Sequence, residues 1–362
     1  MVEWKKLGEI TRRNKGIPIT AGQMSELASK DGNVRVFAAG STIADIDESL
    51  LPKNCAHKLP SIIVKSRGYI DFEFYEKQFT HKNEMWSYSF DNKQEGKFIY
   101  YFLTTQTDFF RNIAKANSVK LPQLCVADTD NFSIPIPSLE EQTRIVGILD
   151  TFTSAIDNLK EQIAQRRKQY EYYRDQLLDL EGKPGVEMKM LGEVCEVYTG
   201  GEVPSGTIKG QLFATEEYPY AVYANGKETY GYSKTYQIAE DAVCISSIGA
   251  NNGAVFYKKG KFTPAIRLKV LIPHDDVLTK FLYYASSKID FRGKNTGSVP
   301  NINANYVKNK YIPLPSLQEQ QRIVSILDTF EASIQNLEAQ LKEREKQYEY
   351  YRNKLLTFEK AE

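Results

Sequence analysis

The stretch IPIPSLEEQTRIVGILDTFTSAIDNLKEQIAQRRKQYEYYRDQLL (residues 134–178) returns later in the chain as IPLPSLQEQQRIVSILDTFEASIQNLEAQLKEREKQYEYYRNKLL (residues 312–356). The two copies share 29 of 45 aligned residues. A shorter echo links EWKKLGEI, which starts at Glu3, with EMKMLGEV, which starts at Glu187. Two copies are too few for a solenoid, which needs several stacked units, so the repeat predicts an internal pseudo-dimer with twofold symmetry.

Each copy is predicted to be one long helix. Ser138 with Glu141 is typical of a capping box at its start, and Ser316 with Glu319 repeats it. Apolar residues then recur at alternating steps of four and three, which is the pattern of a coiled-coil seam. The seam positions are Ile145, Leu149, Phe152, Ile156, Leu159, Ile163, Tyr170, Tyr173, Leu177 and Leu180 in the first copy, and Ile323, Leu327, Phe330, Ile334, Leu337, Leu341, Tyr348, Tyr351, Leu355 and Phe358 in the second.

One seam position in each copy is charged, at Arg166 and Arg344. A charge in the seam lowers the stability of a coiled coil but fixes its register or its choice of partner. The other interpretation is an arginine whose aliphatic stem lies along the seam edge while its guanidinium reaches water. Gly182, Pro184 and Gly185 are expected to end the first helix.

The sequence outside the repeats predicts two globular domains. Tyr, Phe, Val, Ile and Gly alternate there with polar residues, as in 60–79 and 240–262, which indicates short strands and turns. Each block also has one helical stretch, near 97–115 and 278–291. We expect a mixed α/β fold in which two globular α/β domains are joined by two long helices that form an antiparallel coiled coil. The expected parts are domain 1 at 1–133, helix 1 at 134–181, domain 2 at 182–311 and helix 2 at 312–362.

Size and composition agree with a protein of more than one domain. The chain has 362 residues, of which 41% are hydrophobic and 26% are charged, and a single core rarely organises more than about 300 residues. No stretch approaches the roughly 18 uninterrupted apolar residues of a membrane span, so we expect a cytoplasmic protein without a membrane partner. The four cysteines form no CxxC pair, and we interpret them as reduced thiols.

Charge is distributed along the same division. Residues 1–133 carry a net charge of +2 and residues 182–310 carry +4, whereas the two helical segments carry −3 and −2. Since binding to phosphate groups requires local Lys and Arg, any contact with nucleic acid is expected in the globular blocks. The acidic helices suit a protein partner better, although solvated surface charge explains them as well.

Several loops carry the side chains that recognise base edges. Arg and Lys donate to guanine, Asn and Gln match adenine, and Ser and Thr bind either. The alternative for each residue is a solvated turn, because Asn, Ser and Gly favour turns. The candidate DNA-binding residues are Lys65, Ser66, Arg67, Lys115, Asn117, Ser118 and Lys120 in the first block, and Ser246, Ser247, Asn251, Asn252, Lys294, Asn295, Thr296, Ser298 and Asn301 in the second.

The sequence offers little evidence of catalysis. It contains no G-x-G-x-x-G or G-x-x-x-x-G-K-[ST] phosphate loop, and no Asn/Asp-Pro-Pro-Tyr tetrapeptide. His57, His81 and His274 are isolated, so neither a metal site nor a catalytic triad is assembled from them. We therefore expect no catalytic residue, no metal and no cofactor in this chain.

The repeated signature I-P-[IL]-P-S-L-x-E-Q-x-R-I-V-x-I-L-D, at 134–150 and 312–328, resembles that of the DNA-specificity subunits of type I restriction-modification systems. The resemblance covers the whole chain. It implies a non-catalytic protein in which two target recognition domains each read half of a bipartite site in double-stranded DNA. The helices would space these domains and bind two methyltransferase subunits, which would hold S-adenosylmethionine, and restriction subunits that translocate DNA would join them.

Two other functions remain open from the residues alone. One is a coiled-coil adaptor whose globular blocks bind protein, which would show no salt-sensitive binding to duplex DNA. The other is a stand-alone nuclease or modification enzyme, which would show turnover by the purified chain.

The predicted helices are long enough to set the distance between two DNA-reading domains. The rise from Ile145 to Leu180 is about 50 Å at 1.5 Å per residue, which exceeds the roughly 34 Å of one DNA turn.

Overall fold

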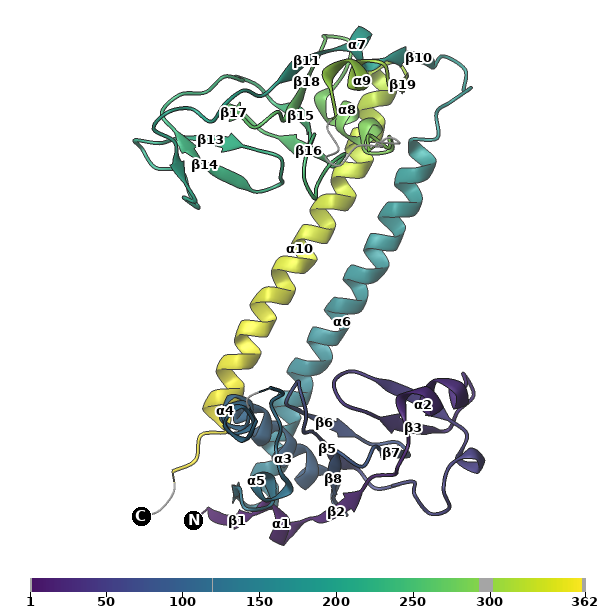
Figure 1. The fold of residues 1–362 in the computed structure, drawn as a ribbon, viewed down its shortest axis with the longest axis vertical. Coiled ribbons are helices and arrows are strands. Elements are labelled where there is room, and N and C mark those ends of the chain that lie inside the picture. The colour runs from purple at the N-terminus through teal and green to yellow at the C-terminus, as the bar shows by residue number, and fades with distance from the viewer. Residues whose placement is uncertain (1, 119, 293–301, 360–362) are drawn as a thin grey trace. The chain divides into compact units, whose positions relative to one another are not determined.

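The computed structural model describes residues 2–118, 120–292 and 302–359, and the chain in it forms two compact units. Unit 1 contains Met1–Glu161 and Ala339–Glu362, and unit 2 contains Gln162–Glu338. Each unit therefore combines one globular part with a piece of both long helices, α6 and α10 (Figure 1).

The globular part of unit 1 alternates short strands with short helices before the first long helix begins. Its elements, in chain order and with the whole of α6, are β1 (Glu3–Lys6), α1 (Leu7–Ile10), β2 (Arg12–Lys15), α2 (Ala21–Leu27), β3 (Val34–Phe37), β4 (Ile43–Ile46), the 3-10 helix η1 (Glu48–Leu50), β5 (Ser61–Lys65), β6 (Asp71–Tyr75), β7 (Phe79–His81), β8 (Trp86–Ser89), α3 (Lys93–Thr105), α4 (Thr107–Asn117), α5 (Val126–Asp130), β9 (Ser133–Ile136) and α6 (Leu139–Leu177).

Unit 2 repeats this order with small differences. Its elements, with the whole of α10, are β10 (Glu187–Met190), α7 (Leu191–Val194), β11 (Cys195–Thr199), β12 (Ile208–Lys209), β13 (Tyr220–Tyr223), β14 (Thr229–Ser233), β15 (Ala242–Ile245), β16 (Val255–Lys258), β17 (Phe262–Pro264), β18 (Lys269–Pro273), α8 (Thr279–Ser286), α9 (Ala304–Lys308), β19 (Tyr311–Leu314) and α10 (Leu317–Leu355).

The sheets of the two units are built alike. The order β2-β8-β5-β6 in unit 1 matches β11-β18-β15-β16 in unit 2, and β4-β3-β7 matches the last three strands of β12-β14-β13-β17. In both of these second sheets the last pair is parallel, β3 with β7 and β13 with β17. An antiparallel ribbon, β1-β9 or β10-β19, leads into each long helix. The expected mixed α/β fold is confirmed, and the two globular parts share one topology although their sequences differ.

The long helices pair in opposite directions within each unit. In unit 1 Phe152, early in α6, stacks on Tyr351, late in α10, with ring centroids 5.4 Å apart. In unit 2 Tyr173, late in α6, stacks on Phe330, early in α10, at the same 5.4 Å. Both pairs lie at seam positions predicted from the sequence, so the antiparallel coiled coil is confirmed.

The two charged seam positions lie at the edge of this aromatic contact. The guanidinium of Arg166 lies 5.8 Å from the centre of the Phe330 ring, and that of Arg344 lies 5.8 Å from the centre of the Phe152 ring. A cation over an aromatic face is favourable, and an arginine can lie along an apolar surface while its guanidinium stays hydrated. The structure thus favours the interpretation of an arginine at the seam edge in both copies.

The ends of the helices differ in detail from the expected signals. Ser138 Oγ accepts a hydrogen bond from the backbone N–H of Glu141, but the Glu141 carboxylate accepts from the guanidinium of Arg144 at 2.7 and 2.8 Å. In the second copy Glu319 and Arg322 form the same pair. The carboxylates thus lie in ion pairs with arginines one turn later. Helix α6 ends at Leu177, and Gly182 takes the left-handed conformation with φ of 73° in the turn that follows.

The helical stretch expected in the first block is divided between two helices. The stretch 97–115 forms the end of α3 and most of α4, which are separated at Gln106, where ψ of 6° interrupts the helix. The second stretch, 278–291, forms only α8, which spans Thr279–Ser286.

One acidic side chain in each unit ties the globular part to the long helix. Asp150 of α6 accepts hydrogen bonds from Lys97 Nζ at 2.7 Å and from the Tyr101 hydroxyl at 2.6 Å, both on α3. Asp328 of α10 accepts from Lys280 Nζ at 3.0 Å and from the Tyr284 hydroxyl at 2.6 Å, both on α8. We call each such set the acid joint. Its aspartate is the last residue of the repeated signature.

The acid joint stands at the edge of the core. Ile145 and Leu149 of α6 are fully buried among residues of the first globular part, and Ile323 and Leu327 of α10 are fully buried in the second. Burial, together with the hydrogen bond to the aspartate, raises the pKa of Tyr101 above its ordinary value, so the phenol stays protonated and donates. The first turns of each helix therefore belong to the globular core, and contacts with the other long helix begin at Phe152 or Phe330.

Replacing either seam phenylalanine should weaken the helix pair. Phe152→Ala and Phe330→Ala each remove one aromatic stack and half-buried surface, and we expect each to lower the free energy of unfolding by about 2 kcal/mol. Denaturant titration followed by circular dichroism measures this. The matched controls are Tyr172→Ala and Tyr350→Ala, whose side chains are 59% exposed and should change stability by less than about 0.5 kcal/mol. Equal effects of all four variants would contradict the seam.

Candidate nucleic-acid interface

The two candidate clusters of the first block form one surface in unit 1. The backbone N–H of Gly68 donates to the carbonyl of Pro122 at 2.8 Å, and that of Leu124 donates to the carbonyl of Ser66 at 2.9 Å. The loop after β5 therefore lies beside the chain that follows α4, although about 50 residues separate them. We call residues 65–69, 115–118 and 120–124 together the unit 1 loop pair.

Within the unit 1 loop pair the candidates divide into buried and exposed residues. Ser66 is 1% exposed, and its hydroxyl donates to the carbonyl of Glu84 at 2.6 Å. Lys65 forms an ion pair with Glu73 at 2.8 Å, with 17% of its side chain exposed. Arg67 is exposed. Ser66 therefore holds the loop, and Arg67 is the member that reaches solvent.

The second cluster of unit 1 also has positioning and exposed members. Asn117 donates from Nδ2 to the carbonyl of Gln123 at 3.2 Å and to Asp128 Oδ2 at 2.9 Å, so it holds the end of α4 against the following loop. Ser118 is half-buried where α4 ends, whereas Lys115 and Lys120 are exposed. The unit 1 loop pair thus presents Arg67, Lys115 and Lys120 around anchored polar groups.

The serines of the second block are buried. Ser246 and Ser247 are both 0% exposed, and their hydroxyls donate to the carbonyls of Asn225 at 3.0 Å and Arg267 at 2.7 Å. A buried hydroxyl that already donates to the backbone does not reach a base edge. Asn251 is exposed and donates from Nδ2 to the carbonyl of Asn225 at 3.4 Å. For this pair of serines the sequence indicates base contacts, whereas the structure shows a support for the loop.

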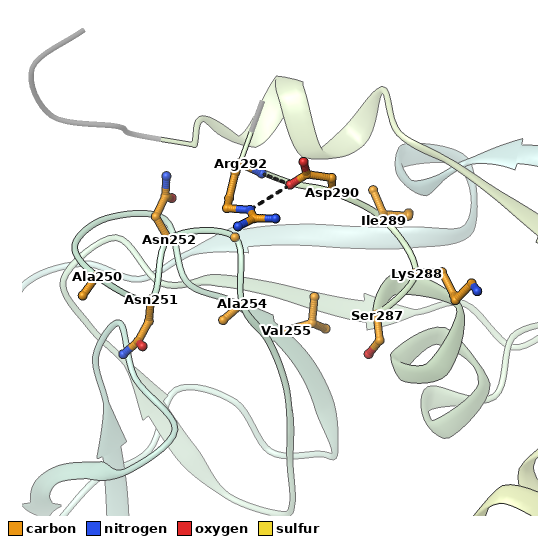
Figure 2. Close-up of a pocket in the computed structure, with 11 residues that line it drawn as sticks. Ala250, Asn251, Asn252, Ala254, Val255, Ser287, Lys288, Ile289, Asp290 and Arg292 are labelled. Carbon is orange, nitrogen blue, oxygen red and sulfur yellow. Dashed lines mark hydrogen bonds and ion pairs between the residues drawn. The ribbon is translucent and has the colours of Figure 1, made fainter. Parts of the chain in front are cut away.

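A pocket of about 590 Å³ lies beside Asn251 and Asn252, between the loop after β15 and the chain that follows α8 (Figure 2). Arg292 lines it and is held by Asp290, whose Oδ1 accepts from Arg292 Nε at 3.2 Å. Gly253, with φ of 85°, lies where a Cβ would come within 2.6 Å of the Arg292 side chain. The candidates Lys294, Asn295, Thr296, Ser298 and Asn301 lie outside the described residues.

The chain past those residues returns to the same loop. The backbone N–H of Ile302 donates to the carbonyl of Ser247 at 3.0 Å, as Leu124 does to Ser66 in unit 1. The hydroxyl of Ser247 donates to Arg267, as Ser66 does to Glu84. The two units therefore build their candidate surfaces on one plan. We call residues 246–253 and 302–303 the unit 2 loop pair.

Sequence reasoning missed three parts of this plan, although each leaves a weak echo. The loops share [VI]-x-S-x-G at 64–68 and 245–249, and the turns beneath them follow F-T at 79–80 and 262–263. The acid joint shares K-F-[IL]-Y-Y, which is KFIYY at 97–101 and KFLYY at 280–284. Matches of two to five residues also occur by chance, so they indicate equivalent positions only once the structure shows the same contacts in both units.

The histidines and cysteines among the described residues include buried members with shifted pKa values. The described residues include no group of three or more His, Cys, Asp or Glu side chains that could hold a metal ion. His81 is fully buried, and burial lowers its pKa to about 4, so the ring is neutral near pH 7. Burial raises the pKa of the Cys195 and Cys244 thiols to about 12, which removes their nucleophilic thiolate form. No helix among the residues described is long and apolar enough to cross a membrane.

The sequence and the fold are similar to known proteins. Residues 1–166 and 184–345 match the type I restriction modification DNA specificity domain. The chain is 33% identical to the specificity subunit of the Escherichia coli type I restriction enzymes EcoR124I and EcoR124II, over 100% of this chain and 95% of that one. A Mycoplasma pneumoniae protein described as a type I specificity subunit is 30% identical over 80% of this chain and 81% of its own. The crystal structure of the S subunit of a type I system from M. genitalium superposes with a TM-score of 0.72 at 18% identity, over 99% of this chain and 97% of that one.

The exposed lysines of unit 1 should contribute charge and no sequence preference. We expect Lys115→Ala with Lys120→Ala to lower the affinity for every DNA duplex by a similar factor. The slope of log K against log salt should become shallower by about 0.9 for each phosphate that the protein no longer neutralises. Titrations at several salt concentrations measure this. Lys65→Ala is the control, because Lys65 is already paired with Glu73 and should change the slope little. A weakening confined to particular sequences would contradict a phosphate role.

Proposed function

Because this chain belongs to the family of type I restriction-modification DNA specificity subunits, we propose that it reads a bipartite site in double-stranded DNA and carries no catalytic centre of its own. Each unit would read one half of the site. The observation that carries this proposal is the pair of loop surfaces, which share buried supports but differ in the side chains they expose.

The buried and the exposed residues of each loop surface have different roles in recognition. The buried hydroxyls of Ser66 and Ser247 bind backbone carbonyls and so fix the position of the loop, and the exposed residues select the base. Arg67 is exposed in unit 1, whereas Asn251 is exposed in unit 2. Arginine matches guanine and asparagine matches adenine, so two surfaces of one shape would read two different half-sites.

The long helices would set the spacing between the half-sites. Each has 39 residues and so a rise of about 58 Å, more than the roughly 34 Å of one DNA turn. Spacing would then depend on helix length and leave the recognition loops unchanged.

The partners we propose are two methyltransferase subunits and the restriction subunits of the same system. The helical segments carry −3 and −2, which disfavours contact with phosphates and favours protein. Tyr172 and Tyr350, at matching positions of the two copies, are each 59% exposed and could serve two copies of one partner. S-adenosylmethionine would bind the methyltransferase subunits, and the assembly would act in the cytoplasm.

Mapping of methylated adenines tests the function directly. In cells that carry this chain with its methyltransferase subunits, we expect methylation at one asymmetric bipartite sequence with a fixed spacer. Deletion of this chain alone should abolish that methylation. Methylation that persists without the chain, or that follows no sequence, would exclude a specificity role.

Partner dependence is a separate prediction. The basic excess of each globular part is small, so we expect the purified chain to bind DNA weakly, and the complex with methyltransferase subunits to bind it specifically. Fluorescence anisotropy at physiological salt compares the two. Full specific affinity of the chain alone would contradict partner dependence.

A fragment that ends near Gly182 should form a homodimer. It retains one globular part and all of α6, whose late seam residues match those that α10 contributes to unit 1. Two copies would therefore pair in opposite directions and, with methyltransferase subunits, methylate an interrupted palindrome of the first half-site. Light scattering and methylation mapping test this. A folded monomer at micromolar concentration would overturn the pseudo-dimer argument.

A further inference from the structure

A strained turn follows β17 in unit 2. Ile266 and Arg267 have φ of 51° and 62°, in the left-handed region. A β-branched residue such as Ile266 rarely adopts this region, because its side chain is crowded against the backbone there. Strain of this kind persists only where the surroundings enforce it, and it clusters at functional sites.

The backbone of this turn is held from three directions. The N–H groups of Ile266 and Arg267 donate to the carbonyls of Gly201 and Gly200 at 2.8 and 3.0 Å. The carbonyl of Arg267 accepts from the Ser247 hydroxyl at 2.7 Å and from Lys269 Nζ at 3.2 Å.

The residues that support the turn are buried or packed closely against neighbouring backbone. Lys269 is only 4% exposed, and its burial lowers its pKa. A Cβ on Gly200 would lie 2.7 Å from the backbone of Pro264. Only glycine therefore allows this approach, and the supporting contacts are built into the fold.

The side chains of the turn are exposed while its backbone is fixed. Ile266 is 36% exposed, and Arg267 is also exposed. Asn225 links the turn to the unit 2 loop pair, because its Nδ2 donates to the carbonyl of Ile266 and its Oδ1 accepts from the N–H of Ser247 at 2.8 Å. Asn251 donates to the same asparagine. The turn therefore belongs to the candidate surface.

Unit 1 has a turn in the corresponding place with different side chains. The N–H of Asn83 donates to the carbonyl of Ile17, as Ile266 does to Gly201, and the carbonyl of Glu84 accepts from Ser66. Asn83 is exposed and lies between Lys82 and Glu84, which form an ion pair at 2.8 Å. The two positions thus share backbone anchoring but present Asn83 and Glu84 in one unit, and Ile266 and Arg267 in the other.

We propose that the turn of residues 265–268 is a base-reading element for the second half-site, in which Arg267 donates to the edge of a guanine. This inference rests on the proposed function. A fixed backbone and an exposed guanidinium are what bidentate donation to guanine O6 and N7 requires. The strained conformation fixes the point from which the arginine side chain extends, and the exposed Ile266 beside it offers an apolar contact to a neighbouring base.

The experiment uses the complex of the full chain with its methyltransferase subunits and a library of duplex DNA randomised in both half-sites. For Arg267→Ala we expect the preference at one guanine of the second half-site to fall about 10- to 100-fold, with the first half-site read as before. The salt slope should stay the same. A uniform drop in affinity with a slope shallower by about 0.9 would show a phosphate contact and overturn the proposal, as would an unchanged preference.

Further variants separate recognition from folding. Ile266→Gly suits the left-handed conformation, so the thermal midpoint should hold or rise while selectivity beside the guanine relaxes. Asn225→Ala introduces the residue that unit 1 has at the corresponding position, Ala39, two residues after the paired strand. We expect it to lower the sequence preference at the second half-site only. Asn83→Ala is the control and should leave the second half-site unchanged. If it relaxed that half-site too, the effect would not belong to the turn.

The same library distinguishes the inference from the function on which it rests. A wild-type complex without any sequence preference would refute the proposed function. A wild-type complex with two defined half-sites, together with an Arg267→Ala variant that reads both as before, would refute the inference alone.

Discussion

The structure depends on a single constraint, which is that each long helix has two different neighbours along its length. Its first turns are buried in one globular core, through Ile145 and Leu149 or through Ile323 and Leu327. Its later turns must then present an aromatic and aliphatic seam to the other helix. The acid joint lies between the turns of the helix that are buried in the globular core and the turns that contact the other helix. A lysine and a tyrosine of the globular part meet an aspartate there, and their hydrogen bonds fix how that part stands on its helix.

Much of this architecture could be predicted because it is encoded locally. The alternation of apolar residues from Ile145 to Leu177 specifies a helix whatever surrounds it, with a seam from Phe152 on, and the second copy gives the same signal independently. Strand-like patterns likewise indicated the mixed α/β blocks. The expected capping boxes formed only in part, since Arg144 and Arg322, one turn later, compete for the glutamates. Side-chain competition of this kind is not visible in a four-residue motif.

The candidate site was less predictable, since it is made by contacts between distant segments. Ser66, Ser246 and Ser247 have the composition of base-reading residues, yet each is buried beneath a loop that it supports. Burial of a polar residue depends on the rest of the chain. The turn at Ile266 and Arg267 left only the short F-T match at 79–80 and 262–263, because neither residue favours a turn and its conformation is imposed by Gly200, Gly201 and Ser247. Of the exposed candidates, Arg67, Lys115, Lys120 and Asn251 remain predictions.

The acid joint also bears on how such a protein changes over generations. Only three side chains form it, two of them four residues apart on one helix of the globular part, and both halves of the chain use the same three types. A gene segment that encodes a different globular part, but keeps that lysine and tyrosine, would find its aspartate partner already in place. The new globular part would also have to pack against Ile145 and Leu149, or against Ile323 and Leu327, because these residues are buried in its core.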